Sequence, residues 1–310
     1  MKMEPAIEEF GGKAKGLLWL KGQGFNVPNF NVLTTAESKN ALHVDQALLA
    51  TLVSDLEYSS DSEARLILGA TIRHHLEQAD IELAAVKNLS SGLDLSKPLA
   101  VRSSAVNEDS SQTSSAGQFE TVIGRFSMDG LGQAIKKVIA SYYADRAIVY
   151  RAANSISQNG PSMAVVVQQL IEPDSAGIAF TCDPVTADNS VIIIEGSFGL
   201  GLPVVSGDVA PDRFVVKKAN LRILKKHRGS KYVVAALANG ELLITKLNQG
   251  ETSYCLSDDE IVKIASICVS IESSVGYPQD IEWAINKGTV YLLQTRPITS
   301  VKFGGTHEFE

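Results

Sequence analysis

The carboxyl-terminal part of the chain contains polar side chains at a spacing typical of one face of a β-hairpin. In residues 279–285, Asp280 and Glu282 alternate with apolar residues, and Gln294 and Arg296 alternate in the same way further on. Successive side chains of a strand point to opposite faces, so each pair shares one face. Two carboxylates, an amide oxygen and a guanidinium are suited to holding Mg²⁺ and to neutralising phosphate oxygens around it.

The turn between these two strands determines whether the two polar pairs meet. A three-residue loop at 286–288, with Gly288 in the left-handed conformation, pairs Glu282 with Leu292 and places all four polar groups on one surface. A change of register by one residue moves every side chain of a strand to the other face. Alternation alone also permits a second interpretation, a solvated outer face with an Arg–Glu pair between the strands.

Two further segments have the composition of anion contacts. Arg102 lies in an otherwise apolar strand and precedes a loop at 110–117 that is rich in Ser and Gly. Small residues let backbone N–H groups approach an anion, and arginine offers two parallel donors; a flexible surface loop is the alternative interpretation. Gly11-Gly12-Lys13 at a predicted helix start can likewise bring a cation and N–H groups to phosphate, although such a lysine is usually solvated.

The composition describes a globular protein of one large or two modest domains. The chain has 310 residues, of which 45% are hydrophobic and 20% are charged. Its net charge of −7 provides no cationic field for a polyanion, so we expect no nucleic acid partner. Since no apolar run approaches the roughly 18 residues of a membrane helix, we expect no membrane partner. Three cysteines without metal-binding spacing, and a start without a signal-peptide pattern, favour a cytoplasmic protein.

Hydrophobic periodicity predicts an α+β protein in two lobes. We predict an N-terminal lobe over 1–185, a C-terminal lobe over 186–300 and a tail or linker at 301–310. Helices are predicted at 13–21, 36–56, 62–86 and 129–153, and after Ser257-Asp-Asp-Glu260, which is a capping box. Strands are predicted at 30–33, 99–104, 119–123, 163–171, 176–181, 191–195, 212–217, 232–236, 241–245, 279–285 and 289–295.

A series of motifs along nearly the whole chain resembles the ATP-binding domain shared by phosphoenolpyruvate synthase, pyruvate phosphate dikinase and rifampin phosphotransferase. The likeness runs from about Gly11 to Thr299. It is carried by Gly11-Gly-Lys-Ala-Lys-Gly16, Val101-Arg-Ser-Ser-Ala-Val-Asn-Glu-Asp109, Ser115-Ala-Gly-Gln118, Val165-Val-Val-Gln168, Ala176-Gly-Ile-Ala-Phe-Thr181, Asp183-Pro-Val185, Gly199-Leu-Gly201, Val205-Ser-Gly207, Pro211-Asp-Arg213, Gln279-Asp-Ile-Glu-Trp283 and Leu293-Gln-Thr-Arg-Pro297. The fold that this resemblance implies is ATP-grasp, two α+β lobes with the nucleotide bound between them.

The resemblance also implies roles for individual residues toward the nucleotide. Lys13 and Arg102 resemble the cations on the ATP phosphates, and Gly117 with Thr121 resembles part of the loop that covers them. Gln168 resembles a nucleotide contact near the junction of the lobes.

The hairpin matches the metal and charge-stabilising positions of the family. Glu282 and Gln294 resemble the Mg²⁺ ligands, with Asp280 beside them, and Arg296 resembles the arginine that stabilises charge on the transferring group. ATP and Mg²⁺ are the implied cofactors, and Arg296, Lys13 and Arg102 are the implied catalytic residues. Phosphoryl transfer depends mainly on positioning and charge neutralisation, which such residues supply.

The implied activity is a phosphotransferase that cleaves ATP to phosphorylate a histidine on a separate domain or protein, with AMP and phosphate as by-products and a small-molecule acceptor. A free-standing ATP-grasp kinase or ligase, which releases ADP, is one alternative, and a degenerate nucleotide sensor is another. The family commonly has Glu after Gly-Leu-Gly, where this chain has Leu202, which puts full catalytic competence in question. The segment around His307 lacks the continuation of the family's phosphohistidine motif, so we interpret it as a tail.

Overall fold

The computed structural model shows two compact units, each with its own sheet, and describes residues 7–106, 109–110, 113–114, 118–159, 163–238, 240–248 and 252–298. The first unit comprises the described residues of 1–22, 28–170 and 239–241. The second comprises those of 23–27, 171–238 and 242–310. Helices and antiparallel strands are mixed in both units, so the α+β class predicted from the sequence is confirmed.

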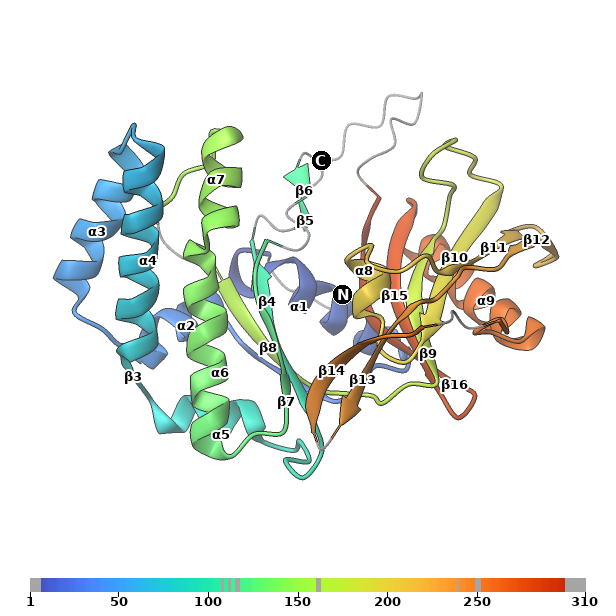
Figure 1. Ribbon diagram of the computed structural model, residues 1–310, viewed down its shortest axis with the longest axis horizontal. Helices are drawn as coiled ribbons and strands as arrows, with labels where there is room; N and C mark the ends of the chain where they lie inside the picture. Colours follow the sequence, from blue (N-terminus) through green and yellow to red (C-terminus); the bar gives the residue numbers. More distant parts are fainter. Residues whose placement is uncertain are drawn as a thin grey trace. The chain divides into compact units, whose positions relative to one another are not determined.

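In the sheet of the first unit, antiparallel strands lie in the order β1 (Phe30–Leu33), β8 (Met163–Gln169), β4 (Leu99–Ala105) and β7 (Thr121–Gly124). Helix α1 (Ile7–Gly22) contacts β4 and β8 on one face, and α6 (Met128–Ala140) contacts them on the other, as Figure 1 shows. Beyond α6 pack α4 (Ser62–Gln78) and α5 (Leu83–Ser90). The main core of this unit therefore lies between β4, β8 and α6.

Three helices predicted as continuous are interrupted. The segment 36–56 is split into α2 (Thr35–Ala41) and α3 (Gln46–Tyr58), and 62–86 is split into α4 and α5. Between the parts, β2 (Leu42–His43) pairs with β3 (Asp80–Ile81), and the side chain of Asp45 caps the start of α3. Periodicity missed these breaks because the apolar pattern continues through them, whereas local backbone pairing and capping end each helix.

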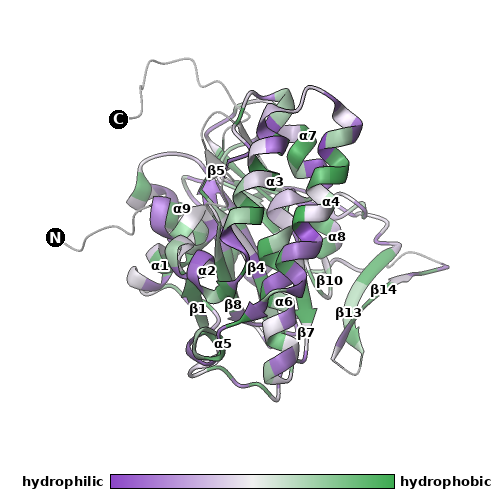
Figure 2. Cartoon of the chain, turned by 90° about the vertical axis from the view of Figure 1, so that its left-hand side faces the viewer, coloured by the Kyte–Doolittle hydropathy of each residue, from purple (hydrophilic) through white to green (hydrophobic). Residues whose placement is uncertain are grey.

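The helix predicted at 129–153 is also interrupted. After α6 come a 3₁₀ turn, η1 (Ser141–Tyr143), and a separate α7 (Asp145–Ala153), with Ala144 extended between them. The apolar side of α6 is as predicted, and Figure 2 shows hydrophobic and hydrophilic residues alternating along it. Its buried apolar residues are Leu131, Ala134, Ile135, Val138, Ile139 and Ala140.

The sheet of the second unit has six antiparallel strands in the order β12 (Ile223–His227), β11 (Asp212–Lys217), β10 (Val191–Phe198), β9 (Ser175–Phe180), β15 (Gln279–Asn286) and β16 (Thr289–Pro297). Helix α9 (Asp258–Val275) covers one face, and its capping box, formed by Ser257 and Glu260, is as predicted. The buried side chains of Ile281, Trp283 and Ile285 alternate with Asp280 and Glu282, so the polar residues lie on the opposite face.

The remaining elements of the second unit lie beside β9 and β10. Helix α8 (Leu202–Val205) contacts β9, and β13 (Val233–Ala238) is joined to the end of β10 by a bridge between Gly199 and Ala235. Strand β14 (Glu241–Lys246) neighbours β13. Its first residue, Glu241, is part of the first unit and pairs with Gly124 of that unit's sheet.

The division between the units falls at Leu170 and Ile171, whereas the sequence placed the lobe boundary at residue 185. The reason is that β9, at 175–180, forms its ladders with β10 and β15 and so belongs to the second sheet. The predicted tail at 301–310 lies outside the described residues. In the part of the chain that is described, no helix is long and apolar enough to span a bilayer.

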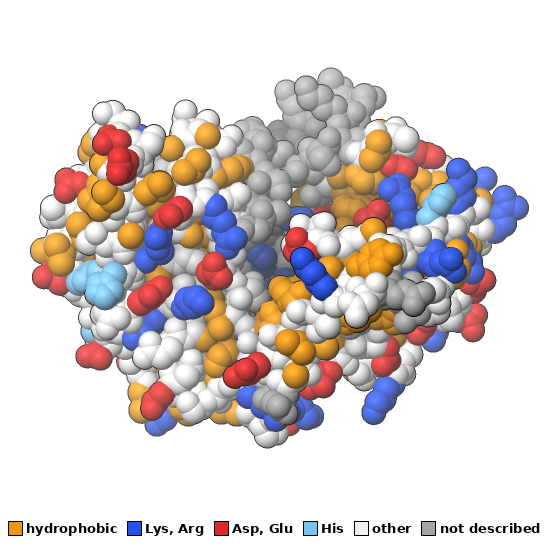
Figure 3. Space-filling view, viewed as in Figure 1, with side chains coloured by type: hydrophobic (Ala, Val, Ile, Leu, Met, Phe, Trp, Pro, Cys, Tyr) orange, Lys and Arg blue, Asp and Glu red, His pale blue; other side chains and the backbone are white. Residues whose placement is uncertain are grey.

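Charged side chains of both signs are interspersed over the face of the molecule shown in Figure 3. Basic side chains gather at the right-hand edge of that view, over β12, whose sequence contains Lys225, Lys226 and His227. No described residue forms part of a cluster of three or more His, Cys, Asp or Glu side chains that could hold a metal ion.

The second sheet leaves no space for a side chain at Gly177, and this tightness is testable. A Cβ atom there would lie 1.9 Å from the carbonyl oxygen of Glu195, which belongs to the backbone of β10 and cannot move aside. We therefore expect Gly177→Ala to lower the free energy of unfolding by about 1–3 kcal/mol in denaturant titrations. Gly22→Ala is the control, since nothing lies within 4 Å of its added Cβ; equal stability of the two variants would contradict this packing.

Candidate functional site

The register of the first sheet places three of the predicted nucleotide contacts on one face. Arg102 of β4 lies opposite Thr121 of β7 and Val166 of β8, and Gln168 lies opposite Ala100, two residues before Arg102. Directly opposed residues of antiparallel strands share a face, as do residues two apart in one strand. Arg102, Thr121 and Gln168 therefore form one polar group, which we call the β4 cluster.

Within the β4 cluster, Gln168 is held as an acceptor and retains a buried donor. The Nη1 atom of Arg102 donates to Oε1 of Gln168 over 3.4 Å. Gln168 is only 3% exposed, and its Nε2 atom has no hydrogen-bond partner in the structure. A buried donor without an acceptor costs about 1–3 kcal/mol, so this position fits a ligand that supplies one. Thr121 is exposed, and Gly117 lies outside the described residues.

Helix α1 is fixed to the same face of the sheet by Ser104, two residues after Arg102. The fully buried hydroxyl of Ser104 accepts a hydrogen bond from the backbone N–H of Ala14 (2.9 Å) and donates one to the carbonyl oxygen of Phe10 (2.7 Å). It thus acts as a cap from another element, satisfying an amide at the start of a helical segment. Lys13, adjacent to Ala14, is thereby held against the strand that carries Arg102.

The contact with Ser104 depends on a break in α1 at Gly11. Gly11 has φ of 66° and ψ of 175°, outside helical geometry, and a Cβ atom on it would lie 2.0 Å from the carbonyl oxygen of Ser104. Only glycine accommodates both the left-handed φ and this approach. The sequence predicted a helix from Lys13, whereas the helix begins at Ile7 and restarts after Gly11. The Gly-Gly-Lys motif is therefore a bend that seats the lysine-bearing segment on β4.

The hairpin of the second unit differs from the prediction in its turn. Asn286 pairs with Thr289, so the turn has two residues, Lys287 and Gly288, with φ of 47° and 74°. The predicted three-residue loop is therefore wrong, although Gly288 does have a positive φ. Two consecutive residues with φ above zero are typical of a type I′ turn, which matches the twist of the flanking strands.

A β-bulge restores the pairing of the polar residues. The register shifts between Glu282 and Trp283, which leaves Leu293 as the extra residue; Glu282 then pairs with Gln294 and not with Leu292. Asp280 pairs with Arg296. Without the bulge, the two-residue turn would place Glu282 opposite Leu293 and the polar pairs on opposite faces. We call these four residues the hairpin cluster, and they share one face, as the sequence predicted.

The two pairs of the hairpin cluster are chemically different. Arg296 donates to the Oδ2 atom of Asp280 from both Nε (2.9 Å) and Nη2 (2.8 Å). The solvated-face interpretation predicted an Arg–Glu pair between the strands; the arginine pairs instead with Asp280. Gln294 is 2% exposed and directly opposite the partly buried Glu282. Opposed side chains have Cβ atoms about 4.5–5.5 Å apart, so the oxygens of Glu282 and Gln294 can converge on one cation.

This oxygen pair is compatible with Mg²⁺. Mg²⁺ is commonly bound by one or two carboxylates together with water and substrate phosphates, and does not require an all-protein cage. Glu282 and Gln294 supply one carboxylate and one neutral oxygen. Asp280, which the sequence placed beside them as a further ligand, is engaged by Arg296.

Sequence reasoning assigned no role to a second charged group on the same face, formed by Asp183, Glu195 and Arg213. Glu195 lies in the cross-sheet row of Glu282, because both pair with Ile178 of β9. Arg213 is opposite Glu195 and contacts its carboxylate at 3.3 Å and that of Asp183 at 3.3 Å. Burial raises the pKa of the Glu195 carboxyl against the lowering effect of Arg213. The signal in the sequence that could have indicated Glu195 is that it is a single charged residue directly after the apolar run 191–194.

Arg213 is positioned by the buried residue before it. Asp212 is fully buried and accepts from Lys231 Nζ (2.6 Å) and from the backbone N–H groups of Gly229 (2.9 Å) and Cys255 (2.7 Å). A buried carboxylate with these three donors is satisfied, which is the condition for burying a charge. The Pro-Asp-Arg motif thus combines a structural aspartate with an arginine on the polar face.

Comparison with known proteins gives consistent matches over almost the whole chain. The sequence pattern of the domain described as "Pyruvate phosphate dikinase, AMP/ATP-binding domain" matches residues 7–308. A probable phosphoenolpyruvate synthase of Methanocaldococcus jannaschii is 32% identical over 96% of this chain and 26% of that protein. A rifampicin phosphotransferase of Bacillus cereus is 33% identical over 94% of this chain and 34% of that protein. The chain therefore spans about a quarter to a third of the length of these relatives.

Solved structures provide a weaker similarity. A D-alanine–D-alanine ligase of Bacillus anthracis aligns with 92% of this chain and 55% of that one, with a TM-score of 0.36 and 9% sequence identity. A similarity of this size does not by itself define the fold.

The attachment of α1 to β4 predicts a specific effect of Ser104→Ala. The substitution leaves the Ala14 amide without its acceptor, so we expect the free energy of unfolding to fall by about 1–3 kcal/mol. We also expect faster hydrogen exchange at the Ala14 amide, measured by NMR. Ser38→Ala is the matched control, because Ser38 is a buried serine of the same unit whose Oγ has no hydrogen-bond partner. An unchanged Ala14 exchange rate would remove the role assigned to Ser104.

The raised pKa of Glu195 predicts a pH dependence of stability. The folded state holds the proton of this carboxyl to a higher pH than the unfolded state does. The contribution of the protonated Glu195 carboxyl to stability is therefore largest below the pKa that it has in the unfolded state. This contribution is lost as pH rises through the raised pKa that it has in the folded state. Because Glu195→Gln cannot titrate, the melting temperature of the variant minus that of the wild type should increase as pH rises from about 4 to 7. A difference that is constant or decreases would contradict this assignment.

Proposed function

Because the chain belongs to the family defined by the AMP/ATP-binding domain of pyruvate phosphate dikinase, we propose that it binds Mg·ATP and cleaves it to phosphorylate a histidine on another domain or protein. The phosphoryl group then passes to a small-molecule acceptor; AMP is the leaving group of the first bond cleavage, and water takes up the phosphate that is released. The relatives are named as probable phosphoenolpyruvate synthase and rifampicin phosphotransferase; the first name describes a product and the second an acceptor. The acceptor histidine and the small-molecule site would belong to the parts of such proteins that this chain does not span.

The observation that carries the proposal is the opposed pair of Glu282 and Gln294 with the opposed pair of Asp280 and Arg296 beside it. The bulge in β16 is needed for this arrangement, whereas a solvated face does not require these polar residues to be paired in this way. When bound, Mg²⁺ would neutralise charge on the phosphate oxygens and orient the transferring group. Glu282 and Gln294 are the residues that would hold it.

The β4 cluster provides the groups for the nucleotide. Lys13 and Arg102 are cations held on one face of the first sheet, suited to phosphate oxygens. The buried Nε2 of Gln168 needs an acceptor, and a nucleotide offers several. A ligand that accepts this hydrogen bond removes an unfavourable contribution to the energy of the unliganded protein, which strengthens its binding.

Arg296 and Lys13, with Arg102, are the residues that we assign to catalysis. Phosphoryl transfer requires charge neutralisation that is already oriented before the reaction, and little covalent chemistry from the protein. The ion pair with Asp280 restricts the rotamers of the Arg296 guanidinium before substrate binds. Asp280 thereby acts as a positioning residue for Arg296 in this proposal, whether or not it also contributes an oxygen to the metal.

The second unit has a further carboxylate, Glu195, although Leu202 stands where the family commonly has an acidic residue. Leu202 begins α8 and is 37% exposed. Glu195 lies on the polar face in the same cross-sheet row as Glu282, about 10 Å away at two inter-strand spacings. We propose that catalytic competence is retained, with Glu195 and Arg213 as part of the charged surface.

The metal assignment predicts the effect of Glu282→Gln. This variant keeps the size of the side chain but removes its charge and replaces one of its two oxygens with an NH2 group, so the Mg²⁺ concentration needed for half-maximal ATP binding should rise at least about 10-fold. Calorimetric titration of ATP at a series of Mg²⁺ concentrations measures this effect. Glu241→Gln is the matched control, because Glu241 is an exposed glutamate in a strand.

Two results of this titration would contradict the assignment of Glu282 to the metal. An unchanged Mg²⁺ dependence in Glu282→Gln would remove the metal site from the hairpin cluster. An equal loss in Glu241→Gln would show that the effect is one of general charge and not of coordination.

A further inference from the structure

A pocket of about 360 Å³ opens in the first unit on the face of the sheet opposite the β4 cluster. Its floor is made of buried apolar residues from five elements: Leu42, Val53, Leu76, Ile139 and Met163. Met163 and Gln168 lie in the same strand, β8, five positions apart, so their side chains point to opposite faces of the sheet. The pocket is therefore separate from the residues assigned to the nucleotide.

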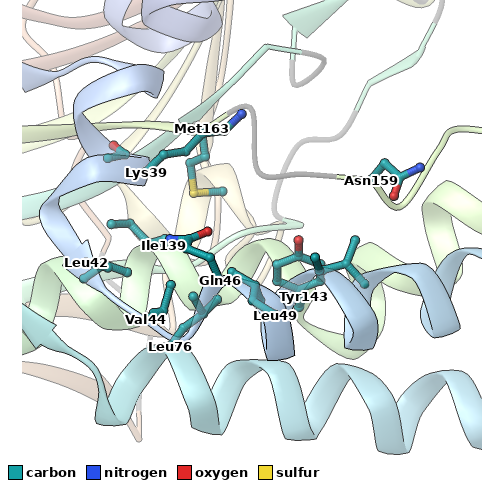
Figure 4. Close-up of a pocket in the computed structure, with 13 residues that line it drawn as sticks. Lys39, Leu42, Val44, Gln46, Leu49, Leu76, Ile139, Tyr143, Asn159 and Met163 are labelled. Carbon is teal, nitrogen blue, oxygen red and sulfur yellow. The ribbon is translucent and has the colours of Figure 1, made fainter.

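Two hydroxyl groups of the pocket lining are buried without a hydrogen-bond partner. They are Oγ of Ser38, in α2, and the hydroxyl oxygen of Tyr143, in η1. Figure 4 shows Tyr143 among the lining side chains, next to Leu49. Burial raises the pKa of Tyr143, so its hydroxyl stays protonated and able to donate at neutral pH. Orphaned hydroxyls in an apolar lining are costly unless an acceptor is supplied.

The mouth of the pocket is polar and carries a positive charge. Lys39, Gln46 and Asn159 line it and are exposed, and Figure 4 shows Lys39 and Asn159 on different sides of the apolar group. Lys39 is the one ionisable side chain, apart from Tyr143, among the described lining residues. The lining therefore favours a ligand whose outer end is anionic and whose body is apolar.

We propose that this pocket binds a small aromatic carboxylate with a hydrogen-bond acceptor at its inner end. Small-molecule sites are typically apolar cavities of about 300–1,000 Å³ with a few placed polar groups, and this pocket is at the lower end of that range. An apolar cavity of about 150 Å³ accommodates benzene, so a body of two fused rings matches the volume here. In the bound state, the inner oxygen accepts from Tyr143 or Ser38, and the carboxylate faces Lys39.

The pocket is tested with 6-hydroxy-2-naphthoate, which has an oxygen at one end of two fused rings and a carboxylate at the other. Equilibrium dialysis against the whole chain measures its affinity. Ala50→Trp fills the pocket from α3 at an exposed position, and we expect it to weaken binding at least 10-fold. Leu48→Trp is the matched control, because Leu48 lies in the same helix, is 45% exposed and does not line the pocket. ATP affinity should be the same in both variants, which separates this site from the nucleotide site.

The inner hydrogen bond is tested by comparing this probe with 2-naphthoate, which lacks the hydroxyl group. The wild type should bind the hydroxylated compound several-fold more tightly, and Tyr143→Phe should remove most of that preference without lowering the melting temperature. Lys39→Gln should weaken both compounds several-fold, and Lys137→Gln, on the exposed side of α6, should weaken neither.

The proposal fails if 6-hydroxy-2-naphthoate does not bind at millimolar concentration, or if Ala50→Trp and Leu48→Trp bind it equally well. Either result would identify the pocket as a packing defect. The pair of tryptophan variants decides the question even if Tyr143→Phe does not fold, because both substitutions are at exposed positions of α3.

Discussion

The register of antiparallel strands is the constraint on which both polar clusters depend. In the first sheet, pairing of Arg102 with Thr121 and of Ala100 with Gln168 collects residues from three strands on one face. In the second sheet, pairing of Glu282 with Gln294 does the same for two strands of a hairpin. A slip of one residue in either ladder would turn a polar side chain of these clusters into the apolar core. The bulge at Leu293 shows this directly, because the tight two-residue turn gives the correct face only when one extra residue is inserted.

The elements around each sheet hold these faces in place by different means. In the first unit, α1 is bent at Gly11 and attached to β4 through the Ser104 hydroxyl, which brings Lys13 to the strand of Arg102. In the second unit, α9 and the buried Trp283 occupy the apolar face, and the fully buried Asp212–Lys231 pair anchors the strand that carries Arg213. The polar groups are thus carried by rigid elements, which is what charge neutralisation in phosphoryl transfer requires.

Local patterns in the sequence predicted most strands of the two sheets and the shared polar face, but not β12 or the features that depend on tertiary contact. Alternation placed Asp280 with Glu282 and Gln294 with Arg296, because a period of two is a property of the strand itself. The predicted turn length was wrong. A three-residue turn without a bulge and a two-residue turn with a bulge both place the polar residues on one face, so alternation does not distinguish them. The breaks at residues 42–45 and 141–144 were missed because apolar periodicity continues across them. The roles of Ser104 and Glu195 depend on partners 90 and 18 residues away along the chain, which a single sequence does not reveal.

The claim that this chain is a Mg·ATP-binding domain is tested most directly by calorimetric titration of the wild-type protein with ATP, once with Mg²⁺ and once with EDTA. We expect saturable binding of one ATP per chain with Mg²⁺, and clearly weaker binding with EDTA, because in our proposal Glu282 and Gln294 act on the nucleotide only through the metal. The absence of saturable binding in both titrations would contradict the account.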